Sequence, residues 1–327
     1  MNVQRGWIAA AAALAAALLP QAGRADPPPL LPALHAQPLP LPGDLATRTF
    51  PGGVRMYGDI TYAERVGYRP LKLDLYLPPH RHGAGPLPLV VWFHGGGYEV
   101  GNPRADWTYG DWSAVLARLA ARGYAVAGVT YRFRREAAWP AQFDDGRDAV
   151  SFLRGHADRW HIDGTRVYAW GLSAGAHLAA MLAMKGTAAQ PQWRVQGVAE
   201  WFGPTDLTTF DRPEGPASTA ALLGCAPTGC LHDTQEAASP VAYVSPAAPP
   251  VLIVHGVRDH LVPIAQGDAF AARLQQAGVD VTYRRLEGLD HGFEGGTSAQ
   301  QDAILLDTFA FFDRLSKASG SLRSSGR

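Results

Sequence analysis

The stretch VYAWGLSAGAHLAAMLAM, residues 167–184, is the part of the sequence from which the architecture can be deduced. Val167–Trp170 is a short apolar run typical of a buried strand, and Ala174–Met184 has the small and apolar residues of a helix packed on a sheet. Between them, residues 171–175 form the pattern G-x-S-x-G in the strand-to-helix context that gives it meaning. This turn predicts Ser173 as a nucleophile at the carboxyl edge of a sheet. The alternative is a serine that caps an ordinary helix.

Strand and helix signals alternate on both sides of this stretch. Apolar runs and apolar-polar alternation predict further strands at Leu71–Leu77, Leu89–Phe93, Tyr124–Tyr131, Val195–Phe202, Val251–Val254 and Val281–Leu286. Helical spacing of apolar residues predicts further helices at Asp111–Arg122, Asp144–Leu153, Ile264–Ala277 and Gln300–Leu315. Strands that alternate with helices imply parallel strands joined by crossover helices. The sequence therefore predicts an α/β fold with a doubly wound, mostly parallel sheet.

A second glycine motif, His94–Gly97, follows the strand that ends at residue 93. Glycines at a strand end expose backbone N–H groups, so Gly96, Gly97 and Ala174 are predicted to form an oxyanion hole. A dinucleotide loop would need another glycine within Tyr98–Val100, and the sequence has no Gly-Lys-Ser/Thr phosphate loop. A merely flexible glycine loop is the remaining alternative. The histidine of this motif is expected to be structural.

A serine nucleophile needs a base, and the base needs a carboxylate that orients it. After a nucleophile turn of this kind the chain order is serine, acid, histidine. Asp259 and His291 each follow a predicted strand, so both belong to the edge where Ser173 is expected. Asp206 is the rival acid. Asp290 adjoins the histidine in sequence but is poorly placed to reach its Nδ1.

The aromatic residues beside these segments suggest a substrate pocket. Tyr98, Trp201 and Phe202 are predicted to line an apolar acyl pocket, and the alternative is that they belong to the core. Residues 204–248 interrupt the strand-helix rhythm and are rich in Pro, Gly, Ser and Thr. Long excursions between strands usually have a function, so this insertion is predicted to be a small lid over the site.

The two ends of the chain differ from its centre. Residues 1–25 combine a positive residue, an apolar run and small residues before Ala25, which predicts a cleaved signal peptide. A membrane anchor is the rival interpretation. It needs about 20 apolar residues, and the apolar run here is shorter than that. Residues 26–43 are predicted to be a proline-rich linker, 44–315 the folded catalytic domain and 316–327 a flexible tail. The protein is thus expected to be secreted or periplasmic.

Cysteine usage agrees with export. The only cysteines are Cys225 and Cys230, which in an exported protein predict one local disulfide. A pair of buried thiols is the alternative. A zinc site is not expected, because no second Cys or His pair has the spacing of zinc ligands.

Charge and composition exclude several classes of partner. Lys and Arg number 29, as do Asp and Glu, so the chain carries no net field that would hold nucleic acid or an anionic membrane. No segment after the apolar run near the N-terminus could span a bilayer. The predicted chemistry needs no metal or cofactor. The oligomeric state is left open.

The sequence resembles the α/β-hydrolase superfamily of serine esterases, in particular the BD-FAE-like group of feruloyl and acetyl-xylan esterases and its hormone-sensitive-lipase-like relatives. The resemblance covers residues 60–312, and its motifs are His94–Gly97, Tyr131–Arg132, Gly171–Gly175 with His177–Ala179, Trp201–Asp206, Pro250–Gly256 with Asp259, and His291–Phe293. It implies Ser173, Asp259 and His291 as a triad, with Gly96, Gly97 and Ala174 as oxyanion donors. Leu172 and Ala176 depart from the hormone-sensitive-lipase pattern, which usually has Asp and Gly there.

The expected activity is therefore hydrolysis of carboxylic esters through an acyl-enzyme. A short-chain acyl ester, or a feruloyl or acetyl ester linked to a polysaccharide, is the expected substrate class. Two other interpretations remain open, namely a serine peptidase of the prolyl-oligopeptidase type and a binding module that keeps the fold without catalysis.

Overall fold

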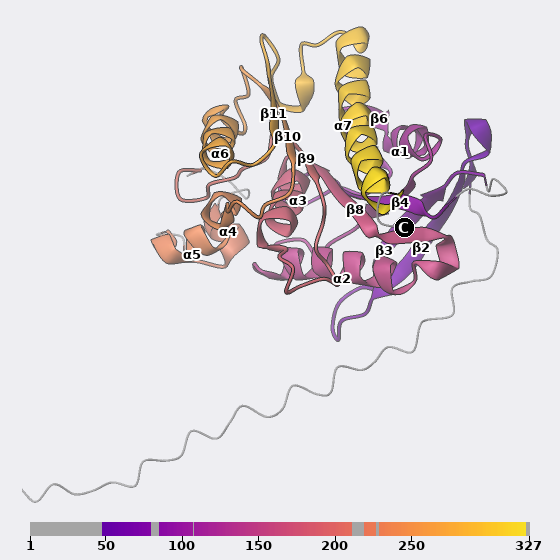
Figure 1. Ribbon diagram of the computed structural model, residues 1–327. Coiled ribbons are helices and arrows are strands. Elements are labelled where there is room, and N and C mark those ends of the chain that lie inside the picture. Colours follow the sequence, from indigo (N-terminus) through magenta and orange to yellow (C-terminus); the bar gives the residue numbers. More distant parts are fainter. Residues whose placement is uncertain (1–47, 80–84, 107, 211–218, 227–228, 325–327) are drawn as a thin grey trace, which may run out of the picture. The chain divides into compact units, whose positions relative to one another are not determined.

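The computed structural model describes residues 48–324, apart from residues 80–84, 107, 211–218 and 227–228 (Figure 1). The predicted signal peptide and linker lie outside the described residues. Among the residues described, no helix combines the length and the hydropathy that crossing a bilayer would require.

A nine-stranded sheet lies at the centre of the described chain (Figure 1). In sheet order its strands are β1 (Arg48–Thr49), β2 (Arg55–Ala63), β3 (Leu71–Leu77), β7 (Ala125–Val129), β4 (Leu87–Phe93), β8 (Ile162–Leu172), β9 (Val198–Trp201), β10 (Val251–Gly256) and β11 (Val281–Leu286). All pairs from β7 to β11 are parallel, whereas β1, β2 and β3 pair antiparallel. The predicted fold class is confirmed.

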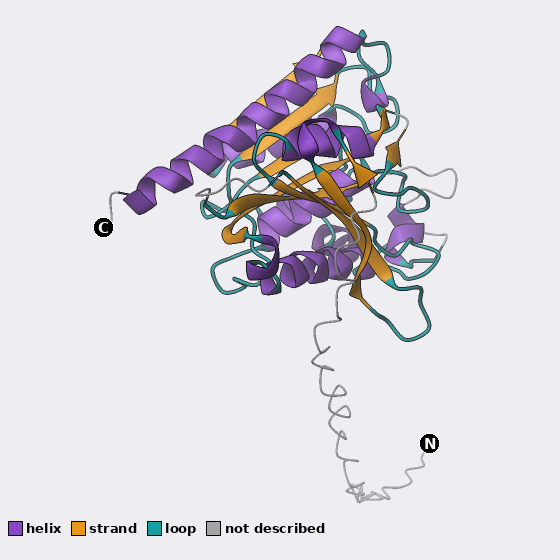
Figure 2. Cartoon of the chain, turned by 90° about the vertical axis from the view of Figure 1, so that its right-hand side faces the viewer, coloured by secondary structure: helices purple, strands orange, loops and turns teal. Residues whose placement is uncertain are grey.

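Helices cover both faces of this sheet, which lies between them in Figure 2. The helices are α1 (Trp112–Ala120), α2 (Ala141–Gly155), α3 (Ala174–Lys185), α4 (Thr219–Leu223), α5 (His232–Ala237), α6 (Ala265–Gln276) and α7 (Ser298–Ser324). A separate hairpin joins β5 (Ala105–Asp106) to β6 (Gly110–Asp111), where α1 begins. Asp111 caps α1, because its side chain accepts a hydrogen bond from the N–H of Ala114.

Large aromatic side chains fill the space between the sheet and the layer of α1 and α7. Trp92 of β4 stacks on Trp112 of α1 with ring centroids 4.5 Å apart, and Trp170 of β8 lies 5.0 Å from Trp201 of β9. All four indoles are completely buried. Burial of such large apolar groups is the dominant stabilising contribution to a fold of this kind.

The structure differs from the sequence prediction near both ends of the described chain. The early strand β2 was not predicted, and it pairs with β3 on its outer side. For this reason Leu71–Leu77 is more buried than its alternation indicates, and Asp74 is only 2% exposed while it accepts hydrogen bonds from Arg104. Helix α7 continues to Ser324, beyond the predicted end of the last helix at Leu315.

Candidate active site

Ser173 stands at a sharp turn between β8 and α3. Its φ of 52° and ψ of −122° lie in a region that residues other than glycine rarely adopt. The turn closes only because its neighbours lack side chains: a Cβ on Gly171 would lie 2.2 Å from the Gly175 carbonyl oxygen, and one on Gly175 would lie 2.1 Å from that of Phe93. The Ser173 N–H donates to the Trp201 carbonyl at 2.9 Å, which ties the turn to β9.

Three predicted residues meet at this turn although they are far apart in sequence. The Ser173 hydroxyl lies 3.1 Å from Nε2 of His291, and Nδ1 of His291 lies 2.7 Å from Oδ2 of Asp259. Asp259 lies on the loop after β10, and His291 on the short turn that follows β11. All three side chains are buried, with exposed fractions of 8% for Ser173, 4% for His291 and 7% for Asp259.

The Asp259 carboxylate is held in its charged form. Its Oδ1 accepts hydrogen bonds from the N–H groups of Leu261 and Val262, at 2.9 Å and 2.7 Å. Burial alone would raise the pKa of Asp259, but hydrogen bonds from His255 and His291 outweigh burial and hold that pKa well below its usual range. The carboxylate is therefore an anion that can accept the Nδ1–H of His291.

Two aromatic rings fix the position of the His291 imidazole. The Phe202 ring packs edge-on against it, with centroids 4.7 Å apart, and Phe293 packs against Phe202 at 4.8 Å. Phe202 has a φ of 43° and Phe293 a φ of 61°. Such strained backbone persists only where the surrounding structure enforces it, and it concentrates at functional sites.

The glycine motif and the start of α3 supply backbone donors beside Ser173. Gly96 has a φ of 110°, and a Cβ there would lie 2.0 Å from the Val100 carbonyl oxygen, so only glycine fits. Within the described part of the chain, the N–H groups of Gly96, Gly97 and Ala174 donate to no protein acceptor. The loop carrying the two glycines also lies against the turn, because a Cβ on Gly95 would come within 3.5 Å of Cβ of Ser173.

Contacts between His94 and Tyr131 help to hold this loop in place. Its ring stacks on Tyr131 at 4.5 Å, and the Tyr131 hydroxyl donates to the His94 carbonyl at 2.8 Å. Burial lowers the pKa of His94 to about 4, so the ring is neutral at physiological pH. These contacts agree with the structural role expected for this histidine.

The three predicted pocket residues are placed differently from one another. Tyr98 is 7% exposed and meets the ring of His177, one helical turn after Ser173, with centroids 5.7 Å apart. Phe202 supports His291. The structure places Trp201 in the core, where its Nε1–H donates to Thr308 at 3.2 Å, so it offers no surface to a substrate.

The other candidate acids are engaged elsewhere. The carboxylate of Asp206 accepts hydrogen bonds from the backbone and hydroxyl of Thr208, at 3.0 Å and 2.6 Å. Asp290 accepts from the backbone N–H of His291 and contacts the ring of His260 at 2.6 Å. The carboxylate that contacts Nδ1 of His291 belongs to Asp259 instead.

One residue beside the site was not singled out by the sequence. His255, at the end of β10, is completely buried, and its Nε2 lies 3.3 Å from Oδ2 of Asp259. The signal was present, because His255 precedes Asp259 by only four residues in the sequence. Only the fold of that loop shows that the two side chains touch.

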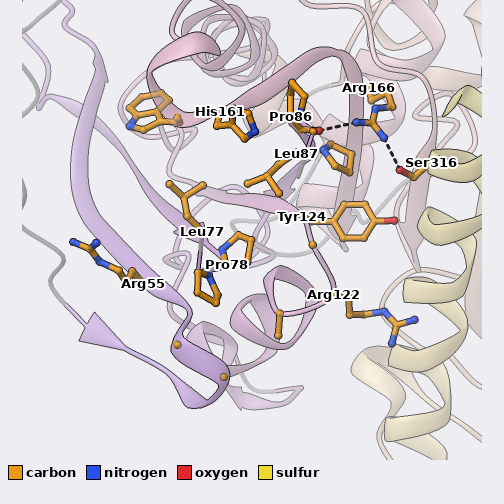
Figure 3. A pocket seen from close by; sticks show the side chains of 18 of the residues that line it. Arg55, Leu77, Pro78, Pro86, Leu87, Arg122, Tyr124, His161, Arg166 and Ser316 are labelled. Atoms are coloured by element: carbon orange, nitrogen blue, oxygen red, sulfur yellow. Dashed lines mark hydrogen bonds between the residues drawn. The ribbon is translucent and has the colours of Figure 1, made fainter. Parts of the chain in front are cut away.

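A large space lies away from these residues. A cavity of about 860 Å³, here called the amino-edge cavity, lies where β4, β7 and β8 begin (Figure 3). Leu87, Tyr124 and His161 line it at those strand starts, with Arg55 and Arg122 beside them. Ser173 lies after the last residue of β8, at the opposite end of the strand.

The expected local disulfide is present. Cys225 and Cys230 are bonded, with their Cα atoms 5.2 Å apart, in the insertion between β9 and β10. The insertion packs on α3 and on a neighbouring loop, since the Ala238 carbonyl accepts from Nε2 of His177 at 2.7 Å and the Leu222 carbonyl from the N–H of Trp139 at 2.9 Å.

A mostly parallel sheet with a serine turn after β8 and an acid and a histidine after β10 and β11 defines an α/β-hydrolase fold. Comparison of the sequence with protein families is more specific. Residues 73–274 match the BD-FAE family model, and the chain belongs to that family.

Curated relatives agree with this assignment. The probable carboxylic ester hydrolase LipM of Mycobacterium tuberculosis is 27% identical over 292 residues, which are 82% of this chain and 66% of LipM. Esterase LipC of the same organism is 30% identical over 223 residues, which are 64% of this chain and 54% of LipC. The chain thus spans between about half and two thirds of the length of these relatives.

Solved structures share the fold at lower identity. A truncated carbohydrate esterase from gut microbiota superposes with a TM-score of 0.66 and 23% identity, over 80% of this chain and 96% of that one. A thermophilic esterase from Thermogutta terrifontis superposes with a TM-score of 0.63 and 24% identity, over 81% of this chain and 95% of that one.

Proposed function

We propose that this protein is an exported serine carboxylesterase that works through Ser173, His291 and Asp259. The observation that carries the proposal is the unbroken chain of contacts from the Ser173 hydroxyl to Nε2 of His291 at 3.1 Å and from Nδ1 of His291 to Asp259 at 2.7 Å. A hydroxyl, an imidazole and a buried anion in this order have the geometry of acyl transfer by a serine nucleophile. The similarity to LipM and LipC, which are named as ester hydrolases, supports the same class.

In the proposed mechanism His291 takes the proton of Ser173 while the hydroxyl oxygen attacks the ester carbonyl carbon. Asp259 holds the imidazole in the tautomer with a free Nε2 and stabilises the imidazolium that forms. The oxyanion accepts hydrogen bonds from the N–H groups of Gly96, Gly97 and Ala174, each of which contributes about 3 kcal/mol in comparable sites. The alcohol leaves with the proton from His291, and a water activated by the same histidine releases the acid.

The proposed substrates are short-chain acyl esters, or feruloyl and acetyl esters, including those linked to polysaccharides. Membership of the BD-FAE family and the shared fold of the gut-microbiota carbohydrate esterase support this class. Tyr98 is the aromatic residue proposed to border the acyl group, because it is buried beside α3 and its hydroxyl has no partner among the described residues. The insertion at 204–248 is proposed to act as the lid.

Export is proposed from the signal-like residues 1–25 and is supported by the Cys225–Cys230 disulfide, since such bonds persist in oxidising compartments. Expression in a secreting host, followed by mass spectrometry of the mature N-terminus, tests it. A mature chain that begins at Asp26 is the expected result, and an uncleaved chain retained in the cell contradicts it.

The activity is tested with a fluorophosphonate probe and a panel of esters. We expect the probe to label Ser173, and p-nitrophenyl esters of increasing chain length to be cleaved, with methyl ferulate and acetylated xylan resolving the substrate class. An amide of the same acid serves as the control, and faster cleavage of the amide than of the ester would favour a peptidase. A properly folded protein that the probe does not label would leave only a binding function.

A further inference from the structure

His255 is a buried histidine that the proposed mechanism does not use. Its Nε2 lies 2.9 Å from the Val262 carbonyl and 3.3 Å from Oδ2 of Asp259. A carbonyl oxygen and an anionic carboxylate both only accept hydrogen bonds, so Nε2 of His255 carries a proton. Oδ2 of Asp259 is thus shared between two histidines, His255 on one side and His291 on the other.

A buried carboxyl group, Glu200, lies near His255 on the neighbouring strand. Glu200 of β9 pairs in register with Ile253 of β10, and because side chains alternate along a strand, His255 points to the same face as Glu200. Glu200 is completely buried, and its Oε1 accepts a hydrogen bond from the Gly203 N–H. Burial raises the pKa of Glu200 to about 7.

Helix α6 closes the pocket around the His255 ring. A Cβ on Gly267 would lie 2.9 Å from Nδ1 of His255 and 2.9 Å from the hydroxyl of Tyr283, so the helix approaches the ring closely. The charged groups near the ring are Glu200 from β9, Asp259 from its own loop and Asp268 from α6, the last of which is paired with Arg285.

These charges favour a proton on His255. Burial alone would lower the pKa of His255, but the hydrogen bond to Asp259 and the charge of Glu200 outweigh burial and raise it. The ring is therefore a strong donor toward Asp259, and hydrogen bonds to charged groups contribute more than neutral ones.

We propose that His255 is a positioning residue for the hydrolytic reaction, which donates its Nε2–H to Asp259 and so fixes both the direction and the basicity of the carboxylate that orients His291. This inference rests on the proposed function. The bond to His255 withdraws negative charge from Oδ2. Without it, Oδ2 of Asp259 would keep more negative charge and would bind the Nδ1–H of His291 more strongly.

The test compares His255→Phe, which keeps a ring but has no donor, with His255→Gln, which keeps an N–H donor. The readout is the pH dependence of kcat/KM for p-nitrophenyl acetate, whose acid limb reports protonation of the histidine base in the free enzyme. We expect His255→Phe to move the midpoint of that limb up by about one pH unit and to lower kcat at pH 7 about tenfold. His255→Gln should restore most of both effects.

His177→Phe is the matched control. His177 is also completely buried and also contacts a backbone carbonyl through Nε2, but that carbonyl is Ala238 of the insertion, at 2.7 Å, rather than a residue beside Asp259. This substitution is expected to destabilise the fold without moving the midpoint of the acid limb. An unmoved midpoint in His255→Phe, or an equal shift in His177→Phe, would overturn the proposal.

A second measurement does not depend on turnover or on either variant. Nitrogen NMR of histidine-labelled wild-type protein distinguishes the tautomers of His255, and we expect Nε2 to be protonated at pH 7. A neutral ring with its proton only on Nδ1 overturns the inference. Labelling of Ser173 by the fluorophosphonate, measured on the same sample, reports separately whether the esterase assignment fails.

Discussion

The two edges of the parallel sheet differ in how closely their side chains are enclosed, although each edge has a residue with a positive φ, Ser173 at one and His161 at the other. At the carboxyl edge, Ser173 and Phe202 have positive φ angles, and the side chains of Ser173, His291 and Asp259 are almost entirely buried. At the amino edge, the cavity of about 860 Å³ is wide and is lined by Arg55, Pro86 and other residues (Figure 3). The proposed catalytic residues thus lie where side chains are closely enclosed and not beside this cavity, as expected if a reacting group must be held in position.

The largest expected effect comes from removing the proposed nucleophile, Ser173, at the carboxyl edge. Ser173→Ala should lower kcat for p-nitrophenyl acetate by roughly a million-fold, as in other serine triads. Thermal unfolding of the variant, measured in parallel, should resemble that of the wild type, because the side chain is small. A variant that keeps a few per cent of the wild-type rate would show that the nucleophile lies elsewhere.

Filling the turn beneath the serine should have the next largest effect. Gly175→Ala places a Cβ 2.1 Å from the Phe93 carbonyl oxygen and 2.4 Å from that of His94, so backbone must move. We expect a loss of about 3 kcal/mol in the free energy of unfolding, measured with urea.

Gly155→Ala is the matched control for this turn. Gly155 ends α2, nothing lies within 4 Å of its added Cβ, and its φ is not positive. The control should change the stability by less than about 1 kcal/mol, and in the stabilising direction. Equal losses of stability in Gly175→Ala and Gly155→Ala would contradict the inference that close packing at the turn excludes a side chain there.

The pH dependence of stability tests the buried acid next to the site. The pKa of Glu200 is raised from 4.5 to about 7 in the folded state, so the folded protein binds more protons than the unfolded chain between these values. The stability that protonated Glu200 contributes to the folded state is therefore present at low pH and is lost as the pH rises through about 7. Glu200→Gln removes this titrating group. Between pH 5 and pH 8 the wild type should therefore lose about 2 kcal/mol more in its free energy of unfolding than the variant does. Parallel pH-stability curves for the two proteins would contradict the raised pKa.

The smallest effect is expected at the amino edge. Arg55 is exposed and lies over the ring of Tyr57, 5.3 Å from its centroid. Arg55→Ala should change both the rate of ester hydrolysis by less than about twofold and the stability by less than about 0.5 kcal/mol. A large loss of hydrolysis of a polymeric ester, with p-nitrophenyl acetate unaffected, would instead show that the amino-edge cavity takes part in substrate binding.

Much of the carboxyl edge could be predicted from sequence, because its signals are local. The turn at residues 171–175 and the glycines at 95–97 are contiguous, and the steric demands that the structure shows at Gly171 and Gly175 are those that the motif implies. Fold class followed from the alternation of strands and helices. Strand β2 was missed because Gly58 and Asp59 interrupt its alternation, at the point where its register with β3 shifts.

The contacts in the site that the sequence did not predict depend on which face of a strand a side chain occupies and on how the chain turns after the strand. Trp201 and Phe202 are adjacent, yet Trp201 points into the core, whereas the chain turns at Phe202 with a φ of 43° and brings that ring to His291. No residue pattern in the sequence signals this turn. The contact between His255 and Asp259 likewise depends on how the loop after β10 folds back, which no motif specifies.

The burial of helix α3 affects how a substrate can reach Ser173. Every residue of α3 from Ala174 to Met184 is buried, so the helix that follows Ser173 is enclosed along nearly its whole length and has no solvent-facing side. We therefore expect the segments around α3 to control the access of an ester to Ser173. Mutations in those segments should change substrate selectivity while leaving Ser173 in place.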